Sequence, residues 1–97
     1  MEIKIGSILY KVKDKDLAIT ESSLGEILYA KGKIHLEPKQ SPERKLETLM
    51  HEVLHGVFYE AGIEDQEEDV INRVGKMLTQ TLTDNPLLLQ KLKEGRL

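Results

Sequence analysis

Apolar and polar residues alternate over the first third of the chain, and a period of two is typical of β-strands. The alternating apolar positions of residues 1–12 are Ile3, Ile5, Ile8, Tyr10 and Val12. Residues 17–20 are a further candidate strand, and apolar runs at 25–30 and 33–37 flank Lys31-Gly32, which is expected to form a tight turn. Residues 1–37 are therefore predicted to form three to five short antiparallel strands.

The spacing of apolar residues changes to three and four after residue 41, as in an amphipathic helix. Ser41-Pro42 is a favourable helix start, because serine caps the first turn and proline fits its first position. Gly62 is expected to end this helix, and two more helices are predicted over 65–83 and 85–94. A sheet followed by helices predicts a single α+β domain over residues 1–97.

Length, charge and composition narrow the function classes. The 97 residues fit one domain, and the net charge of -3 makes nucleic acid an unlikely partner because no concentrated positive field is available. The absence of cysteine excludes disulfide scaffolds, thiol catalysis and cysteine-ligated zinc. No apolar run approaches the length of a membrane span, and no segment is typical of a secretory signal, so a cytoplasmic location without membrane partners is expected.

One motif in the first helix carries recognisable chemistry. His51-Glu52-Val53-Leu54-His55 matches H-E-x-x-H, in which two histidines one helical turn apart bind the same zinc ion. The glutamate of the motif, Glu52, is the expected general base that takes a proton from a zinc-bound water. From composition alone, roughly 0.01 chance matches to this metalloprotease motif are expected in a chain of this length. The alternative interpretation is that these side chains decorate a solvated helix face.

A catalytic zinc site needs a third protein ligand and one open position. The remaining histidine, His35, lies on a predicted strand, where a solvent-exposed side chain is the plainer interpretation and a position lining the cleft the alternative. A carboxylate at the start of the second helix is therefore the expected third ligand, and its candidates are Glu64, Asp65, Glu67, Glu68 and Asp69. Glu68 is favoured because it lies at the edge of the apolar face, whereas Glu67 lies on the core stripe and stays an alternative. Asn72, one turn later, is expected to hydrogen-bond a ligating histidine.

These residues resemble the zincin metallopeptidases that have a glutamate as third ligand. Glu68 followed by Asn72 is similar to their E-x-x-x-D/N helix, in which the glutamate binds zinc and the second residue orients a histidine. Within this group the chain resembles the small ImmA/IrrE-like proteins of phages and other mobile elements. Their second-helix pattern, E-x-x-A-N-x-F-A-x-x-L, reads here as Glu68, Ile71, Asn72, Val74, Gly75 and Leu78. The resemblance implies one zinc ion per chain and cleavage of a repressor or transcription regulator.

Three further features have a plain and a functional interpretation. Tyr59, one turn after His55, is either a partly buried helix tyrosine or a donor to an oxyanion. The strand at 33–37 is expected to form the rim of the cleft and to pair with an extended substrate. The apolar face of the last helix is expected to pack on the core or, alternatively, to form a homodimer or bind a regulator; it consists of Leu87, Leu88, Leu89 and Leu92.

Two functional hypotheses follow. The first is a zinc metallopeptidase that hydrolyses a peptide bond of a peptide or protein substrate through a zinc-bound water. The second is a phage-type interaction module in which zinc stabilises the fold and the chain binds a host or phage regulator without hydrolysis. The small size of the chain, without an evident second subdomain, favours the second hypothesis, and the glutamate of the motif favours the first.

Overall fold

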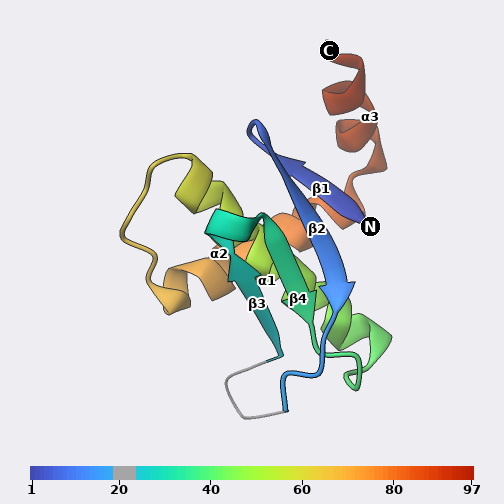
Figure 1. Cartoon of the computed structure of the whole chain (residues 1–97). Helices are drawn as coiled ribbons and strands as arrows, with labels where there is room; N and C mark the ends of the chain where they lie inside the picture. Colours follow the sequence, from blue (N-terminus) through green and yellow to red (C-terminus); the bar gives the residue numbers. More distant parts are fainter. Residues whose placement is uncertain (19–23) are drawn as a thin grey trace.

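The computed structural model describes residues 1–18 and 24–97, in which a mixed sheet of four strands is followed by three α-helices (Figure 1). The elements are β1 (Glu2–Ile5), β2 (Ile8–Asp14), β3 (Gly25–Leu28), the 3-10 helix η1 (Tyr29–Lys31), β4 (Lys33–Leu36), α1 (Pro42–Glu60), α2 (Glu68–Asp84) and α3 (Pro86–Glu94). The predicted α+β class is confirmed. Over the described residues, no helix combines the length and apolar character needed to cross a bilayer.

The sheet has the strand order β1-β2-β4-β3, and this order corrects the prediction that all strands are antiparallel. β1 pairs antiparallel with β2, and β3 pairs antiparallel with β4, but β4 lies between β2 and β3 and runs parallel to β2. The turn expected at Lys31-Gly32 is instead η1 followed by Gly32, whose φ of 63° lies in the left-handed region. Of the candidate strand at 17–20, Leu17 and Ala18 are not in a strand, and residues 19 and 20 lie outside the described residues.

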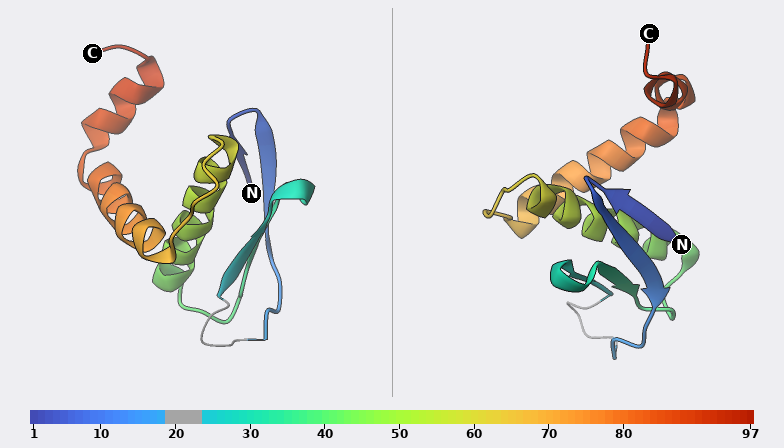
Figure 2. Two further views of the ribbon diagram at one scale, coloured as in Figure 1. Left: turned by 90° about the vertical axis from the view of Figure 1, so that its left-hand side faces the viewer. Right: turned by 45° about the horizontal axis from the view of Figure 1, so that its top comes forward.

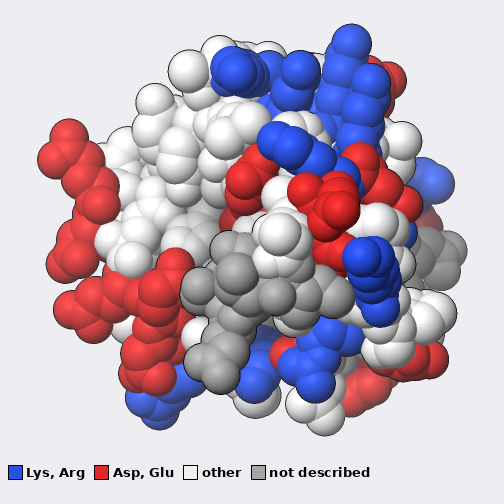
Figure 3. All heavy atoms as spheres, turned by 60° about the horizontal axis from the view of Figure 1, so that its bottom comes forward, with Lys and Arg blue, Asp and Glu red and all other residues white. Residues whose placement is uncertain are grey.

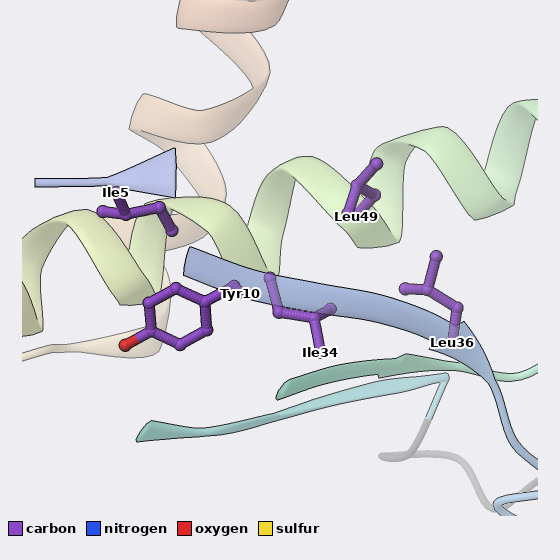
Figure 4. Packing of buried hydrophobic residues seen from close by; sticks show 5 residues of the cluster. All are labelled: Ile5, Tyr10, Ile34, Leu36 and Leu49. Atoms are coloured by element: carbon purple, nitrogen blue, oxygen red, sulfur yellow. The ribbon is translucent and has the colours of Figure 1, made fainter. Parts of the chain in front are cut away.

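One face of the sheet packs against α1 and forms the core (Figures 2 and 4). The buried cluster consists of Ile5, Tyr10, Ile34, Leu36 and Leu49. Gly56 allows the close approach of α1 to the sheet, because a Cβ there would lie 2.7 Å from the Cδ1 atom of Ile5. Helix α1 is therefore held against this face of the sheet at both Leu49 and Gly56.

Helix α1 begins and ends where the sequence predicts. The Ser41 hydroxyl accepts a hydrogen bond from the Arg44 backbone N–H at 3.2 Å, as an N-cap does. After the helix, Gly62 has φ of 79° and the Ile63 N–H donates to the Phe58 carbonyl at 2.9 Å, which closes the last turn.

The second and third helices are held more loosely. α2 begins at Glu68, three residues later than predicted, because residues 61–67 form an irregular connection. α2 packs along α1 and buries only Ile71 and Gly75. α3 extends away from the sheet at the end of α2 and buries no residue, so the expected packing of α3 on the core is wrong (Figures 1 and 2).

Candidate metal centre

Three potential metal ligands meet where the start of α2 crosses the middle of α1. His51 and His55 lie one turn apart on α1, and their Nε2 atoms are 3.2 Å apart. The Glu68 carboxylate lies with one oxygen 3.1 Å from His51 Nε2 and the other 2.9 Å from His55 Nε2. The structure thus brings together the two histidines of the motif and the favoured third residue.

The chemistry of these atoms fits a single cation. Ligands about 2.0–2.1 Å from a tetrahedrally coordinated zinc ion lie roughly 3.3 Å from one another. With one atom taken from each residue, the three candidate ligand atoms lie within 4.8 Å of one another, and the two histidine Nε2 atoms are 3.2 Å apart. Because acceptor atoms converge here, either a proton on a ring nitrogen or a metal ion must lie between them. Two imidazoles and one carboxylate are typical ligands of a transition metal.

Gln66, a residue that sequence reasoning missed, orients the second histidine. The Gln66 Oε1 atom lies 2.6 Å from His55 Nδ1, and it also accepts a longer hydrogen bond, 3.4 Å, from the Tyr29 hydroxyl. A carbonyl oxygen can only accept, so His55 carries its proton on Nδ1 and presents the Nε2 lone pair to the centre. Asn72 was predicted to hydrogen-bond a ligating histidine. Within residues 1–18 and 24–97 it makes no hydrogen bond to His51 or His55, and it lines the neighbouring cleft instead.

Glu52 is buried beside the triad. It is 7% exposed, and its carboxylate forms no hydrogen bond within the described part of the chain. Burial raises the pKa of Glu52 from 4.5 to about 7, His55 opposes this shift, and the negative charge of Glu68 adds to it. Gly25 leaves room for this carboxylate, because a Cβ at Gly25 would lie 3.2 Å from Glu52 Oε2 and 2.6 Å from the Thr48 methyl group.

A cleft of about 650 Å³ opens next to the triad. It runs between α1 and α2, and the residues just before and at the start of β3, Leu24 and Gly25, close one side. His51, Glu52 and Glu68 all line it. A buried carboxylate and two of the three candidate metal ligands therefore share one solvent-accessible space.

The strand beside this cleft is β3 rather than the predicted strand at 33–37. β4 occupies the interior of the sheet, whereas β3 is the terminal strand of the described sheet. The Glu37 N–H donates to the Leu24 carbonyl at 2.9 Å, so alternate β3 residues bond to β4. By this alternation, Gly25 and Ile27 direct their backbone N–H and C=O groups away from β4.

The other candidate residues lie outside the triad. His35 alternates with the buried residues of β4, points to the opposite face of the sheet, and lies with Nδ1 2.7 Å from a Glu26 carboxylate oxygen. Tyr59 is half exposed and stacks on Tyr29, with ring centroids 4.0 Å apart. Glu67 is the exposed N-cap residue of α2 and is not among the three converging ligands.

No family model, curated protein or solved structure matches this chain. The geometry therefore carries the functional argument. It establishes a candidate three-residue metal site, His51, His55 and Glu68, next to a buried glutamate and an open cleft.

Proposed function

We propose that this chain is a zinc-dependent metallopeptidase-like protein that hydrolyses a peptide bond, with a regulatory protein as its substrate. The observation that carries the proposal is the position of Glu52, which is buried beside the triad and faces the same cleft as His51 and Glu68. A site that only stabilises the fold needs no buried carboxylate at this place. The choice of a regulatory substrate rests on the resemblance to ImmA/IrrE-like proteins.

The ligand set supports zinc as the ion. His51, His55 and Glu68 would hold one ion per chain, and two histidines with one glutamate are the protein ligands of a well-known class of catalytic zinc sites. When bound, the ion polarises a substrate carbonyl and makes water acidic enough to attack at neutral pH. Gln66 keeps the His55 Nε2 lone pair available for that ion.

The residues of the chain account for the proton transfers. Glu52 accepts the proton of the attacking water at its carboxylate, and it delivers this proton to the nitrogen of the leaving amine. The same carboxylate thus serves as base and then as acid, and its place in the lining of the cleft puts it within reach of the substrate in both steps.

The outer edge of β3 supports a peptide as the substrate. Gly25 and Ile27 direct backbone groups away from β4, so an extended peptide can add to the sheet by backbone hydrogen bonds. A peptide in this position passes Gly25, whose missing side chain gives access to Glu52. The peptide bond is thereby brought next to the candidate base.

Glu52→Gln tests the proposal. Zinc-loaded wild-type protein and the variant are incubated with a pool of unfolded peptides, and new peptide termini are counted by mass spectrometry. We expect cleavage by the wild type, no cleavage by the variant, and one zinc per chain in both. Glu2→Gln, at an exposed position of β1 that does not line the cleft, is the control and should cleave like the wild type. Cleavage by Glu52→Gln at the wild-type rate, or a wild type that binds zinc and cleaves nothing, would overturn the proposal.

A second candidate function, a zinc-stabilised interaction module for a host or phage regulator, is favoured by one observation. α2 buries only Ile71 and Gly75, so an ion that joins Glu68 to α1 would contribute much of what holds this helix. Removal of the metal by a chelator distinguishes the two functions. A structural ion predicts loss of helical circular dichroism together with the metal, whereas a catalytic ion predicts loss of cleavage with most of the helix signal retained.

A further inference from the structure

The third helix packs only loosely against the rest of the described chain. α3 buries none of its nine residues, and its four leucines are between 42% and 64% exposed. An isolated helix of this length is marginal in water, because short helices gain too few hydrogen bonds to offset their ordering. The apolar side of α3 therefore needs a surface to pack against.

A second group of exposed apolar residues lies on α2, the helix that precedes α3. Four of them line one shallow surface together with Arg73 and Thr81, and they are Val70, Val74, Met77 and Leu78. The two helices together form an arm that projects beyond the sheet, as Figure 2 shows from two sides. An apolar surface of this extent on a small domain is typical of an interaction site. We call the exposed apolar residues of the two helices the arm face; they are Val70, Val74, Met77, Leu78, Leu87, Leu88, Leu89 and Leu92.

The charges at the two ends of the arm are opposite. Acidic residues precede and begin α2, and they are Glu64, Asp65, Glu67, Glu68 and Asp69. In Figure 3 acidic side chains gather along the side on which Figure 1 places the connection between α1 and α2. Beyond the start of α3 the charges are mostly basic, with Lys91, Lys93 and Arg96 against one acidic residue, Glu94. A surface with an acidic start, an apolar middle and a basic end is complementary to itself when two copies run antiparallel.

We propose that the arm face is a homodimer interface, in which the α2–α3 arms of two copies pack antiparallel about a two-fold axis. In this arrangement the apolar middles cover each other, and the basic segment 91–96 of each copy lies beside Glu64, Asp65 and Glu67 of the other. Glu68 and Asp69 are not used, because Glu68 meets the two histidines and Asp69 lies 3.5 Å from Arg73 of its own helix. Such an isologous contact closes on itself and produces a dimer rather than a chain of subunits. Charge complementarity at both ends also fixes the antiparallel direction.

This dimer leaves the candidate site open. The arm face uses Val70, Val74 and Met77 of α2, whereas the cleft uses Asn72, Lys76 and neighbouring residues on another side of the same helix. The homodimer does not depend on metal binding or hydrolysis. A monomeric protein would leave the proposed peptidase function unaffected, and a protein without peptidase activity would leave the proposed homodimer unaffected.

Analytical ultracentrifugation over a range of concentrations tests the interface. The wild type is expected to sediment as a dimer that dissociates on dilution. Met77→Glu, which places a charge in the middle of the arm face, should sediment as a monomer with unchanged helical circular dichroism. Leu9→Glu changes a similarly exposed apolar residue on β2, and this control should stay dimeric. A wild type that is monomeric throughout, one that forms open-ended assemblies, or a Met77→Glu variant that dimerises like the wild type would overturn the proposal.

A charge exchange tests the antiparallel direction. Lys91 is left unchanged, because its Nζ atom lies 3.5 Å from the Glu94 carboxylate in the same helix. The variant therefore carries Lys93→Glu and Arg96→Glu. We expect the dimer to dissociate at least tenfold more readily, and to be restored when Glu64 and Asp65 are replaced by lysine in the same chain. Unchanged dimerisation in the first variant, or no recovery in the combined variant, would contradict the arrangement.

Discussion

Replacing Glu52 by glutamine should stabilise the metal-free protein at alkaline pH. Glu52 is 7% exposed, and its pKa is raised from 4.5 to about 7, chiefly because burial disfavours the charged form. In the unfolded chain the carboxyl ionises near its ordinary pKa, whereas in the folded chain it keeps its proton to about pH 7. The folded state thus loses stability as pH rises through this window, and the loss persists at higher pH.

The size of this loss of stability follows from the difference between the pKa of Glu52 in the folded chain and its pKa in the unfolded chain. One pKa unit corresponds to about 1.36 kcal/mol, so the cost of the ionised Glu52 side chain has a ceiling of about 3 kcal/mol. Glu52 lines the open cleft, and water there lowers the cost. We therefore expect Glu52→Gln to raise the free energy of unfolding by about 1–2 kcal/mol near pH 8, and by much less near pH 5.

Urea denaturation of chelator-treated protein at the two pH values measures this difference. Glu47→Gln is the control, because it removes a charge from a half-exposed side chain of the same helix and should change stability little at either pH. A bound cation would offset the charge of Glu52, so the gain should shrink when zinc is added. An equal gain at both pH values, or a loss near pH 8, would show that burial does not penalise the ionised Glu52 carboxylate.

Two further predictions concern positioning and packing. Gln66→Leu should weaken metal binding about 10–100-fold, because His55 loses the partner of its Nδ1 atom. Asn72→Ala should change metal binding little. Competition with a chromogenic chelator measures the metal affinity of both variants. Gly56→Ala should destabilise the fold by about 1–3 kcal/mol despite its better helix propensity, because the new Cβ lies 2.7 Å from the Ile5 side chain; thermal unfolding measures the loss, and a gain in stability would contradict the packing.

Helical periodicity accounts for the part of the site that could be predicted. Four-residue spacing puts His51 and His55 on one face of α1 wherever that helix packs. Strand alternation likewise places His35 on the outer face of β4. These inferences need only local geometry, which the sequence carries. The expected place of Glu67 on the core stripe is wrong, because Glu67 precedes α2 as its exposed N-cap residue.

The features that were missed depend on the path of the chain between regular elements. Gln66 reaches His55 from the irregular connection at 61–67, and no period indicates where such a side chain points. The parallel pairing of β2 with β4 depends on a crossing of the chain, and alternation alone does not reveal a strand's neighbour. The same crossing makes β3 the strand beside the cleft.

Metal content is the most direct test of the candidate centre. Tag-free protein is offered zinc, freed of excess, and analysed by mass spectrometry together with Glu68→Ala and Glu67→Ala. One zinc per chain in the wild type and in Glu67→Ala, with loss in Glu68→Ala, is the predicted result, because Glu68 alone of the two carboxylates meets both histidines. A wild type without zinc, or equal retention of zinc in both variants, would contradict the assignment of His51, His55 and Glu68 as a metal site.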